Sequence, residues 1–209
     1  MVSGRCDIVY ERIRYLNAHN RLLAIILLEV IMGIYLNPGN ENFTSMTSRE
    51  IYVDKTEMIS VINHFMDTDN KYLCMSRPRR FGKTMAGNML SSYYSKGCDS
   101  RELFLPYKIA KDPDFDDPNG KRNRQNVIKL DLNSEYQTIR DREHMIRIVE
   151  DKIKREMRTE FPEVDIPEYY SLAEALLEIY AKTKETFIII IDEYVGREVF
   201  ELLGKDIYL

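Results

Sequence analysis

Two short stretches of the chain carry residue types that phosphate chemistry requires. The first is SRPRRFGKT, residues 76–84, in which Gly82, Lys83 and Thr84 have the spacing of a phosphate-binding loop. Arg77 stands where the usual pattern has its first glycine, which is tolerable if the turn there needs no positive φ. A Gly-Lys-Thr tripeptide alone is weak evidence, because an ordinary helix start can have the same residues.

A strand, a glycine turn and a helix in succession would make this loop an anion site. Backbone N–H groups and the positive end of the helix then face a phosphate. Lys83 would neutralise the β- and γ-phosphates of a bound nucleotide, and Thr84 would offer its hydroxyl to Mg²⁺. The arginines of the loop either contact phosphate or face solvent or an acidic partner. The candidate nucleotide-binding residues are Arg79, Arg80, Phe81, Gly82, Lys83 and Thr84.

The second stretch is TFIIIIDEY, residues 186–194, a continuously apolar strand that ends in two acids. Open α/β sheets bind ligands at the carboxyl ends of their strands. Asp192 would hold Mg²⁺ there together with Thr84, and Glu193 would orient or deprotonate an attacking water as the catalytic residue. The alternative is a strand that ends in solvated acids. The two stretches together, a Walker A and a Walker B motif, favour a nucleotide-hydrolysing domain.

The pattern between these motifs alternates strands with helices, which predicts an α/β fold with a mainly parallel sheet. The expected architecture is a three-layer P-loop NTPase sandwich, incomplete on its C-terminal side because only three strands are evident. Asp54 and Glu57 suggest a capping box for a helix that continues to Phe65. We expect strands at 71–76, 127–133 and 186–194, a short strand or extended piece at 50–54, a solvated loop at 112–126, and helices at 83–95, around 146–153 and at 168–183.

Composition limits the class of protein further. The chain has 209 residues, 44% of them hydrophobic and 31% charged, with a net charge of −4, so it lacks the global basicity of many nucleic-acid-binding proteins. Its 3 cysteines fit neither a disulfide framework nor a zinc pattern, which favours a reducing cytoplasm.

The first 31 residues differ from the rest of the chain. The apolar run RLLAIILLEVIMGIYL is interrupted by Glu29, and its uninterrupted part is too short to span a bilayer, which needs about 20 residues. Three interpretations stay open: a translated leader upstream of Met32, an amphipathic helix, or a targeting segment. The predicted division is a leader at 1–31 and an ATPase-like domain at 32–209.

Five collinear blocks of the chain resemble the bacterial AAA-ATPase-like family. They are GIYLNPGNENF, IYVDKTEMI, the segment 71–104, VIKLDLN and IIIIDEY. The resemblance implies a P-loop ATPase domain that uses ATP and Mg²⁺ and is often followed by a PD-(D/E)XK nuclease-like domain. It also implies that Arg77 is a variant of the family rather than a decayed position. Residues 51–56 are a candidate for the wall that contacts the base.

The chain departs from the family pattern after Tyr194, where no sensor residue or arginine finger has a counterpart. We therefore expect Mg²⁺-dependent ATP binding with weak or no hydrolysis, so the resemblance to an ATPase leaves enzymatic activity undecided. The alternative is a non-catalytic interaction fragment of a larger ATPase or nuclease-associated protein. Besides the nucleotide, a second copy of the chain or another protein domain is a candidate partner. No basic groove with interleaved aromatics supports nucleic acid as a partner, and no segment supports a membrane.

Overall fold

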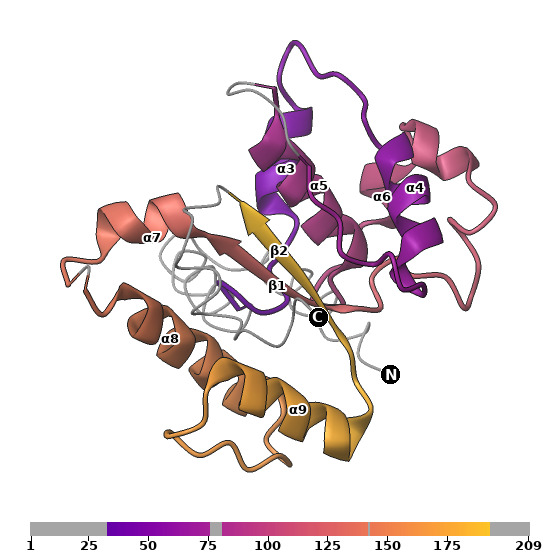
Figure 1. The fold of residues 1–209 in the computed structure, drawn as a ribbon. Helices are drawn as coiled ribbons and strands as arrows, with labels where there is room; N and C mark the ends of the chain where they lie inside the picture. The colour runs from indigo at the N-terminus through magenta and orange to yellow at the C-terminus, as the bar shows by residue number, and fades with distance from the viewer. Residues whose placement is uncertain (1–32, 76–80, 142, 193–209) are drawn as a thin grey trace, which may run out of the picture.

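The computed structural model describes residues 33–75, 81–141 and 143–192. The predicted leader and the residues beyond Asp192 lie outside these ranges. Figure 1 shows the described part as helices arranged around two adjacent strands. The elements are α3 (Glu41–Thr47), α4 (Glu57–Met66), α5 (Lys83–Tyr94), α6 (Arg101–Phe104), the 3-10 turn η1 (Lys108–Lys111), β1 (Asn126–Asp131), α7 (Leu132–Thr138), α8 (Met145–Glu160), α9 (Leu172–Thr183) and β2 (Phe187–Asp192).

Strands β1 and β2 form a parallel ladder. Their register pairs Asn126 with Phe187 at one end and Asp131 with Asp192 at the other. The second edge of β1 is covered by residues 35–37, since Leu36 forms an antiparallel bridge with Ile128. The sheet in the described residues has two strands, β1 and β2. Its parallel pairing fits the α/β class that the alternating pattern predicts.

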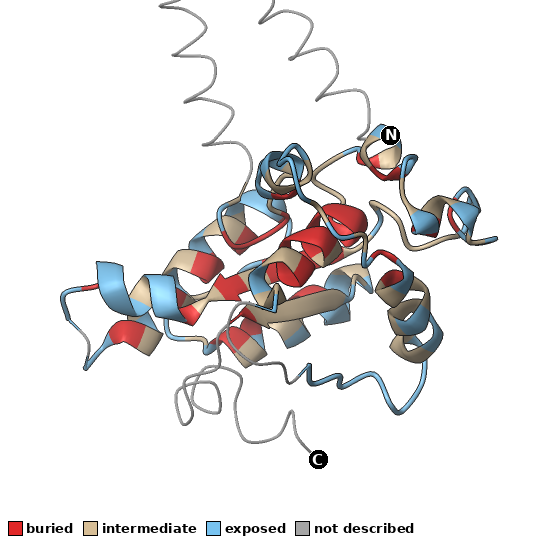
Figure 2. Cartoon of the chain, turned by 90° about the horizontal axis from the view of Figure 1, so that it is seen from above, coloured by how far each residue is buried: buried red, intermediate tan, exposed pale blue. Residues whose placement is uncertain are grey.

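Helices pack on both faces of this sheet. On one face, Val127 of β1 is buried in a cluster with residues of α4, α5 and α6, among them Tyr93 and Phe104. On the other face, Ile128 is buried with residues of α8 and α9, such as Ile153. Figure 1 shows α8 and α9 across the strands from α3 and α5. Buried residues gather between these layers, and exposed ones lie on the outward faces and connecting segments (Figure 2).

Most of the predicted helices are present. The helix expected at 83–95 is α5, and the stripe around 146–153 belongs to α8, in which Val149 and Ile153 are fully buried. Within 168–183, α9 begins at a capping box, where Ser171 and Glu174 satisfy each other's backbone N–H groups.

The capping box predicted for α4 is wrong. Thr56, not Asp54, is the N-cap residue, and its side chain makes no capping hydrogen bond. The carboxylate of Asp54 instead accepts hydrogen bonds from the backbone N–H and hydroxyl of Thr56 and from the N–H of Lys108. These bonds connect the start of α4 to η1. Because Lys108 is distant in the sequence, the local spacing of Asp54 and Glu57 does not reveal this role of Asp54.

The strand predicted for 71–76 is also wrong over its described residues, 71–75, which have no regular structure. They are exposed, with 59% of Tyr72 and 51% of Leu73 accessible to solvent. A short apolar run becomes a strand only when it finds a pairing edge, and its sequence cannot supply that information. Residues 50–54 form no strand, which leaves the alternative of an extended piece.

The loop predicted for 112–126 has no helix or strand before β1 begins at Asn126, and most of it is accessible. Phe115 is the exception, since it is 2% exposed and packs in the α5 cluster. The side chain of Arg122 lies over its ring. Phe115 therefore anchors this loop to the hydrophobic core.

Candidate functional site

Helix α5 runs antiparallel to β1, which decides where its first residues lie. After the C-terminal end of α5, Ser95 bridges Gln125 just before the strand. Closer to the middle of both elements, Asn88 accepts a hydrogen bond from the ammonium of Lys129. Because residue numbers fall along α5 as they rise along β1, the N-terminus of α5 lies at the edge where β1 and β2 end. Residues 82–84 and the last residues of both strands thus belong to the same side of the molecule.

Helix α5 begins at a glycine with a left-handed backbone conformation. Gly82 is the N-cap residue with φ 78° and ψ 34°, in the left-handed region that glycine adopts without strain. In the part of the chain that the structure describes, Lys83 makes no hydrogen bond or ion pair, so its ammonium is available to a ligand. Thr84 is exposed, which leaves its hydroxyl accessible.

Lys55 adds a positive charge to this end of α5. Its ammonium donates a hydrogen bond of 2.9 Å to the carbonyl of Phe81, and it lies 3.4 Å from the position of a Cβ built on Gly82. Phe81 itself is 58% exposed. The segment 51–56, which the sequence suggests as a wall for the base, therefore reaches the loop through its lysine. No local pattern points to this contact, because the two residues are 26 positions apart.

The carboxyl edge of the sheet holds two aspartates of different character. Asp131 caps α7 by accepting a hydrogen bond of 2.9 Å from the N–H of Ser134. Asp192 is only 5% exposed, and its Oδ2 atom is buried without a hydrogen-bond partner among the described residues. Buried carboxylate oxygens are usually hydrogen-bonded in native structures, and a bound water, ion or ligand is one explanation for such an oxygen.

Both aspartates lie on the face of the sheet that α5 covers. Successive side chains of a strand point to opposite faces, so Asp131 shares a face with Lys129, and Asp192 shares one with Ile190. A Cβ built on Gly87 of α5 would lie 3.6 Å from the side chain of Ile190 and 3.9 Å from that of Lys129. The side chains of these four strand residues therefore lie under α5, at or near the end where Gly82 starts it.

Lys129 is a site residue that the sequence does not reveal. Burial lowers its pKa, while the carboxylates of Asp192 and Asp131 act in the opposite direction. Its position in the apolar strand pattern resembles an ordinary outward-facing lysine. Only the contact with α5 shows that its charge lies inside the molecule.

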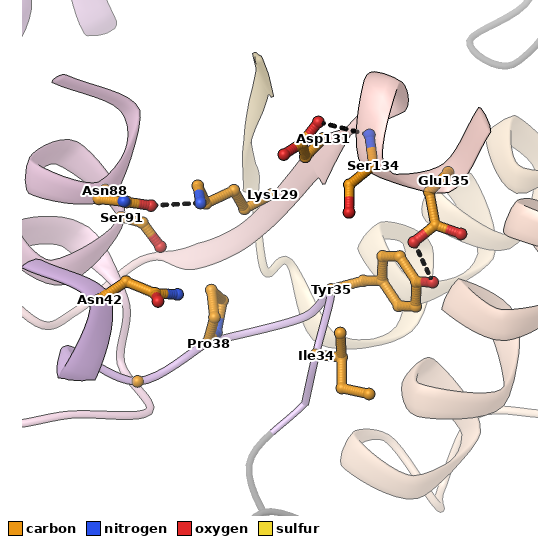
Figure 3. Close-up of a pocket in the computed structure, with 11 residues that line it drawn as sticks. Ile34, Tyr35, Pro38, Asn42, Asn88, Ser91, Lys129, Asp131, Ser134 and Glu135 are labelled. Atoms are coloured by element: carbon orange, nitrogen blue, oxygen red, sulfur yellow. Dashed lines mark hydrogen bonds between the residues drawn. The ribbon is translucent and has the colours of Figure 1, made fainter. Parts of the chain in front are cut away.

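A cavity of about 260 Å³ opens beside Lys129. Figure 3 shows Lys129 and Asn88 on one side of it, Asp131 and Ser134 above, and Glu135 with Tyr35 on the other side. Glu135 is already satisfied, because it accepts hydrogen bonds from the hydroxyl of Tyr35 and the ammonium of Lys152. The cavity gives small solutes access to the lysine and to the carboxyl edge of β1.

The structure thus brings some predicted site residues to one edge of the sheet. Gly82, Lys83 and Thr84 start α5, and Asp192 ends β2 at that edge. Arg79, Arg80 and Glu193 lie outside the described residues, as does the first position of the loop, Arg77.

A parallel sheet with helices on both faces, and a glycine-started helix at its carboxyl edge, defines a domain of the α/β class. The sequence profile of a family described as "Predicted AAA-ATPase" matches residues 38–205, and the chain belongs to this family. Its function is therefore ATPase-like at the level of the family. No curated protein and no solved structure gives a significant match. Across the ranges that the structure covers, no helix has the length and apolar character needed to cross a bilayer.

Proposed function

We propose that this chain binds ATP together with Mg²⁺ at the carboxyl edge of the β1–β2 sheet, in the manner of a P-loop ATPase. The observation that carries the proposal is the antiparallel path of α5, which supports a common site for Gly82 and Asp192 although they are far apart in the sequence. The family match makes ATP the expected nucleotide.

The residues at this edge fit the phosphates. The positive φ of Gly82 lets the chain turn sharply into α5, so that the first N–H groups of the helix are free to face an anion. Lys83 adds a positive charge that no described residue neutralises. Arg79, Arg80 and Phe81 belong to the same loop by sequence, and Phe81 would contribute its backbone rather than its exposed ring.

The residues also fit a magnesium ion. Asp192 offers a buried carboxylate oxygen with no partner among the described residues, and Thr84 offers an accessible hydroxyl. Within the described ranges, no group of three or more His, Cys, Asp or Glu side chains could hold a metal ion. This suits Mg²⁺, which keeps several waters and is bound by one or two protein ligands plus the phosphates of its nucleotide.

Hydrolysis, where it occurs, would involve the residue that follows Asp192. Glu193 is the candidate to orient or deprotonate the attacking water, and Lys83 would stabilise charge on the phosphates. Bound Mg²⁺ neutralises the negative charge that develops in such a transfer. Nucleotide binding and turnover are separate parts of the proposal. Turnover requires several groups to be positioned together, and binding alone does not.

Titration calorimetry with Mg·ATP tests the proposal. Lys83→Ala should weaken binding by roughly 2–4 kcal/mol, the scale of losing one partner of a desolvated charge contact. Lys182→Ala is the matched control, because that lysine pairs with Glu178 on the remote helix α9. Equal affinity of the wild type and Lys83→Ala would contradict the site, and absence of binding by the wild type would contradict the function.

A further inference from the structure

Lys129 occupies an unusual place for a lysine in this fold. It stands in the middle of β1, paired across the ladder with Ile190, and its side chain runs under α5. Its ammonium donates a hydrogen bond to the Oδ1 atom of Asn88. The amide nitrogen of Asn88 in turn lies 3.3 Å from the sulfur of Met46, which is consistent with the orientation that points its oxygen at the lysine.

The charge of Lys129 is balanced at a distance. Asp131 follows it by two positions on the same face, and Asp192 lies beside Asp131 on the neighbouring strand. With strands about 4.8 Å apart and a rise of about 3.3 Å per residue, the backbones of Lys129 and Asp192 are about 8 Å apart. The two side chains project from the same face of the sheet. Both carboxylates attract the ammonium, yet among the described residues it forms no direct ion pair.

We propose that Lys129 is an internal counter-cation for Asp192, which offsets the charge of the carboxylates at the sheet edge until a divalent cation arrives there. The inference rests on the proposed function, in which Asp192 binds Mg²⁺. Lys129 is a positioning residue in this scheme, because it acts through Asp192 and not on the nucleotide's reacting atoms.

A cation that stabilises the metal-free site must also oppose the metal. When Mg²⁺ binds, the ammonium and the ion are like charges near one carboxylate. Their repulsion makes the binding free energy of the metal less favourable. Lys129 therefore reduces the factor by which Mg²⁺ improves ATP binding.

The test measures the dissociation constant for ATP in EDTA and in saturating Mg²⁺. The ratio of the first constant to the second is the factor by which Mg²⁺ improves ATP binding. Lys129→Met keeps the length of the side chain and removes the charge, so it should raise this ratio about tenfold, the scale of one charge interaction in a partly buried site. Lys129→Arg retains the charge and should leave the ratio within about twofold of the wild type.

The matched control is Lys96→Met. Lys96 is also partly buried, with 26% of its side chain exposed, and pairs with Glu185 near the start of β2, at the other end of the sheet. The same change of net charge at this position should leave the ratio unaltered. A change equal to that of Lys129→Met would show a general effect of charge and would overturn the inference.

Two further variants keep the inference falsifiable if Lys129→Met does not fold. Asn88→Asp places a negative charge against the ammonium and should also raise the ratio. In an Asp192→Asn background, Lys129→Gln should have no effect on the ratio, and an effect that persists there would overturn the role. Wild-type protein that binds ATP with a ratio unchanged in Lys129→Met and Asn88→Asp would overturn this inference alone. Wild-type protein that does not bind ATP would overturn the proposed function and this inference together.

Discussion

Asp192 of β2 lies directly beside Asp131 of β1 at the last rung of the parallel ladder. The two carboxylates have the same sequence context, an acid that ends an apolar strand, but different partners. Asp131 accepts the N–H of Ser134 and so caps α7, whereas the Oδ2 atom of Asp192 is buried without a partner among the described residues. One aspartate is thus used by the fold, and its neighbour is available to a ligand.

This difference predicts opposite results for the two substitutions. Asp192→Asn should remove most of the gain in ATP affinity that Mg²⁺ provides, because an amide is a poor ligand for this ion. Asp131→Ala should instead lower the free energy of unfolding by about 1 kcal/mol, the usual value of an N-cap, and keep the metal dependence within about threefold. Calorimetry with and without EDTA, together with urea unfolding, checks both. Loss of metal dependence in Asp131→Ala alone would reverse the assignment.

The sequence is sufficient for those elements whose signal is local. The stripe of α8 repeats at helical spacing, and the apolar run of β2 is flanked by charged residues, so both are recognisable without their neighbours. Residues 71–75 have a similar apolar composition, but a strand also needs an edge to pair with. That requirement is tertiary, and it is why their exposed, irregular conformation could not be predicted.

The candidate site divides in the same way. Gly82, Lys83 and Asp192 follow from motif spacing, since each is defined by its immediate neighbours in sequence. Lys129 depends on Asn88, which is 41 positions away, and Lys55 depends on the carbonyl of Phe81, which is 26 positions away. A contact between separate elements leaves no periodic signal in the chain, so the two lysines could be found only from the fold.

Asp54 should make the stability of the protein depend on pH in the acid range. Burial opposes its charged form, but hydrogen bonds from the backbone N–H groups of Thr56 and Lys108 outweigh burial and lower its pKa. A depressed pKa contributes stability that is present above the unfolded value, about 3.9, and is lost as pH falls through the lower folded value. Asp54→Asn should therefore be less stable than the wild type at pH 7, and the difference should shrink below about pH 4.

Urea unfolding of both proteins between pH 7 and pH 3 measures this difference. Asp69→Asn is a suitable control, because Asp69 is exposed near the end of α4. A gap between the wild type and Asp54→Asn that stays constant down to pH 3 would show that the hydrogen bonds do not discriminate between the charged and neutral carboxyl group.

Ile153 should be a major determinant of stability, because it anchors α8 to the sheet. It is fully buried in the cluster that includes Ile128. Ile153→Ala should lower the free energy of unfolding by about 2–5 kcal/mol, through lost burial and the cavity left behind. Leu177→Ala on α9 removes an apolar side chain that is 67% exposed, and should change stability by less than about 0.5 kcal/mol. Denaturant melts that give similar losses for the two variants would contradict the layered core.

Two glycines of α5 should respond to alanine in opposite directions. Gly82 has φ 78°, which costs an alanine roughly 1–2 kcal/mol, although a Cβ there would meet only the ammonium of Lys55 at 3.4 Å. The penalty therefore comes from the backbone, and Gly82→Asn should lose less, since asparagine tolerates this region.

Gly87 lies inside the helix, where a Cβ would make ordinary contact with Ile190 at 3.6 Å. Gly87→Ala should raise the free energy of unfolding by up to about 1 kcal/mol, because alanine favours the helix. Thermal melts of the three variants check the order. A destabilised Gly87→Ala would mean that α5 packs closer to the strands than described, and an unchanged Gly82→Ala would mean that the helix does not need its left-handed start.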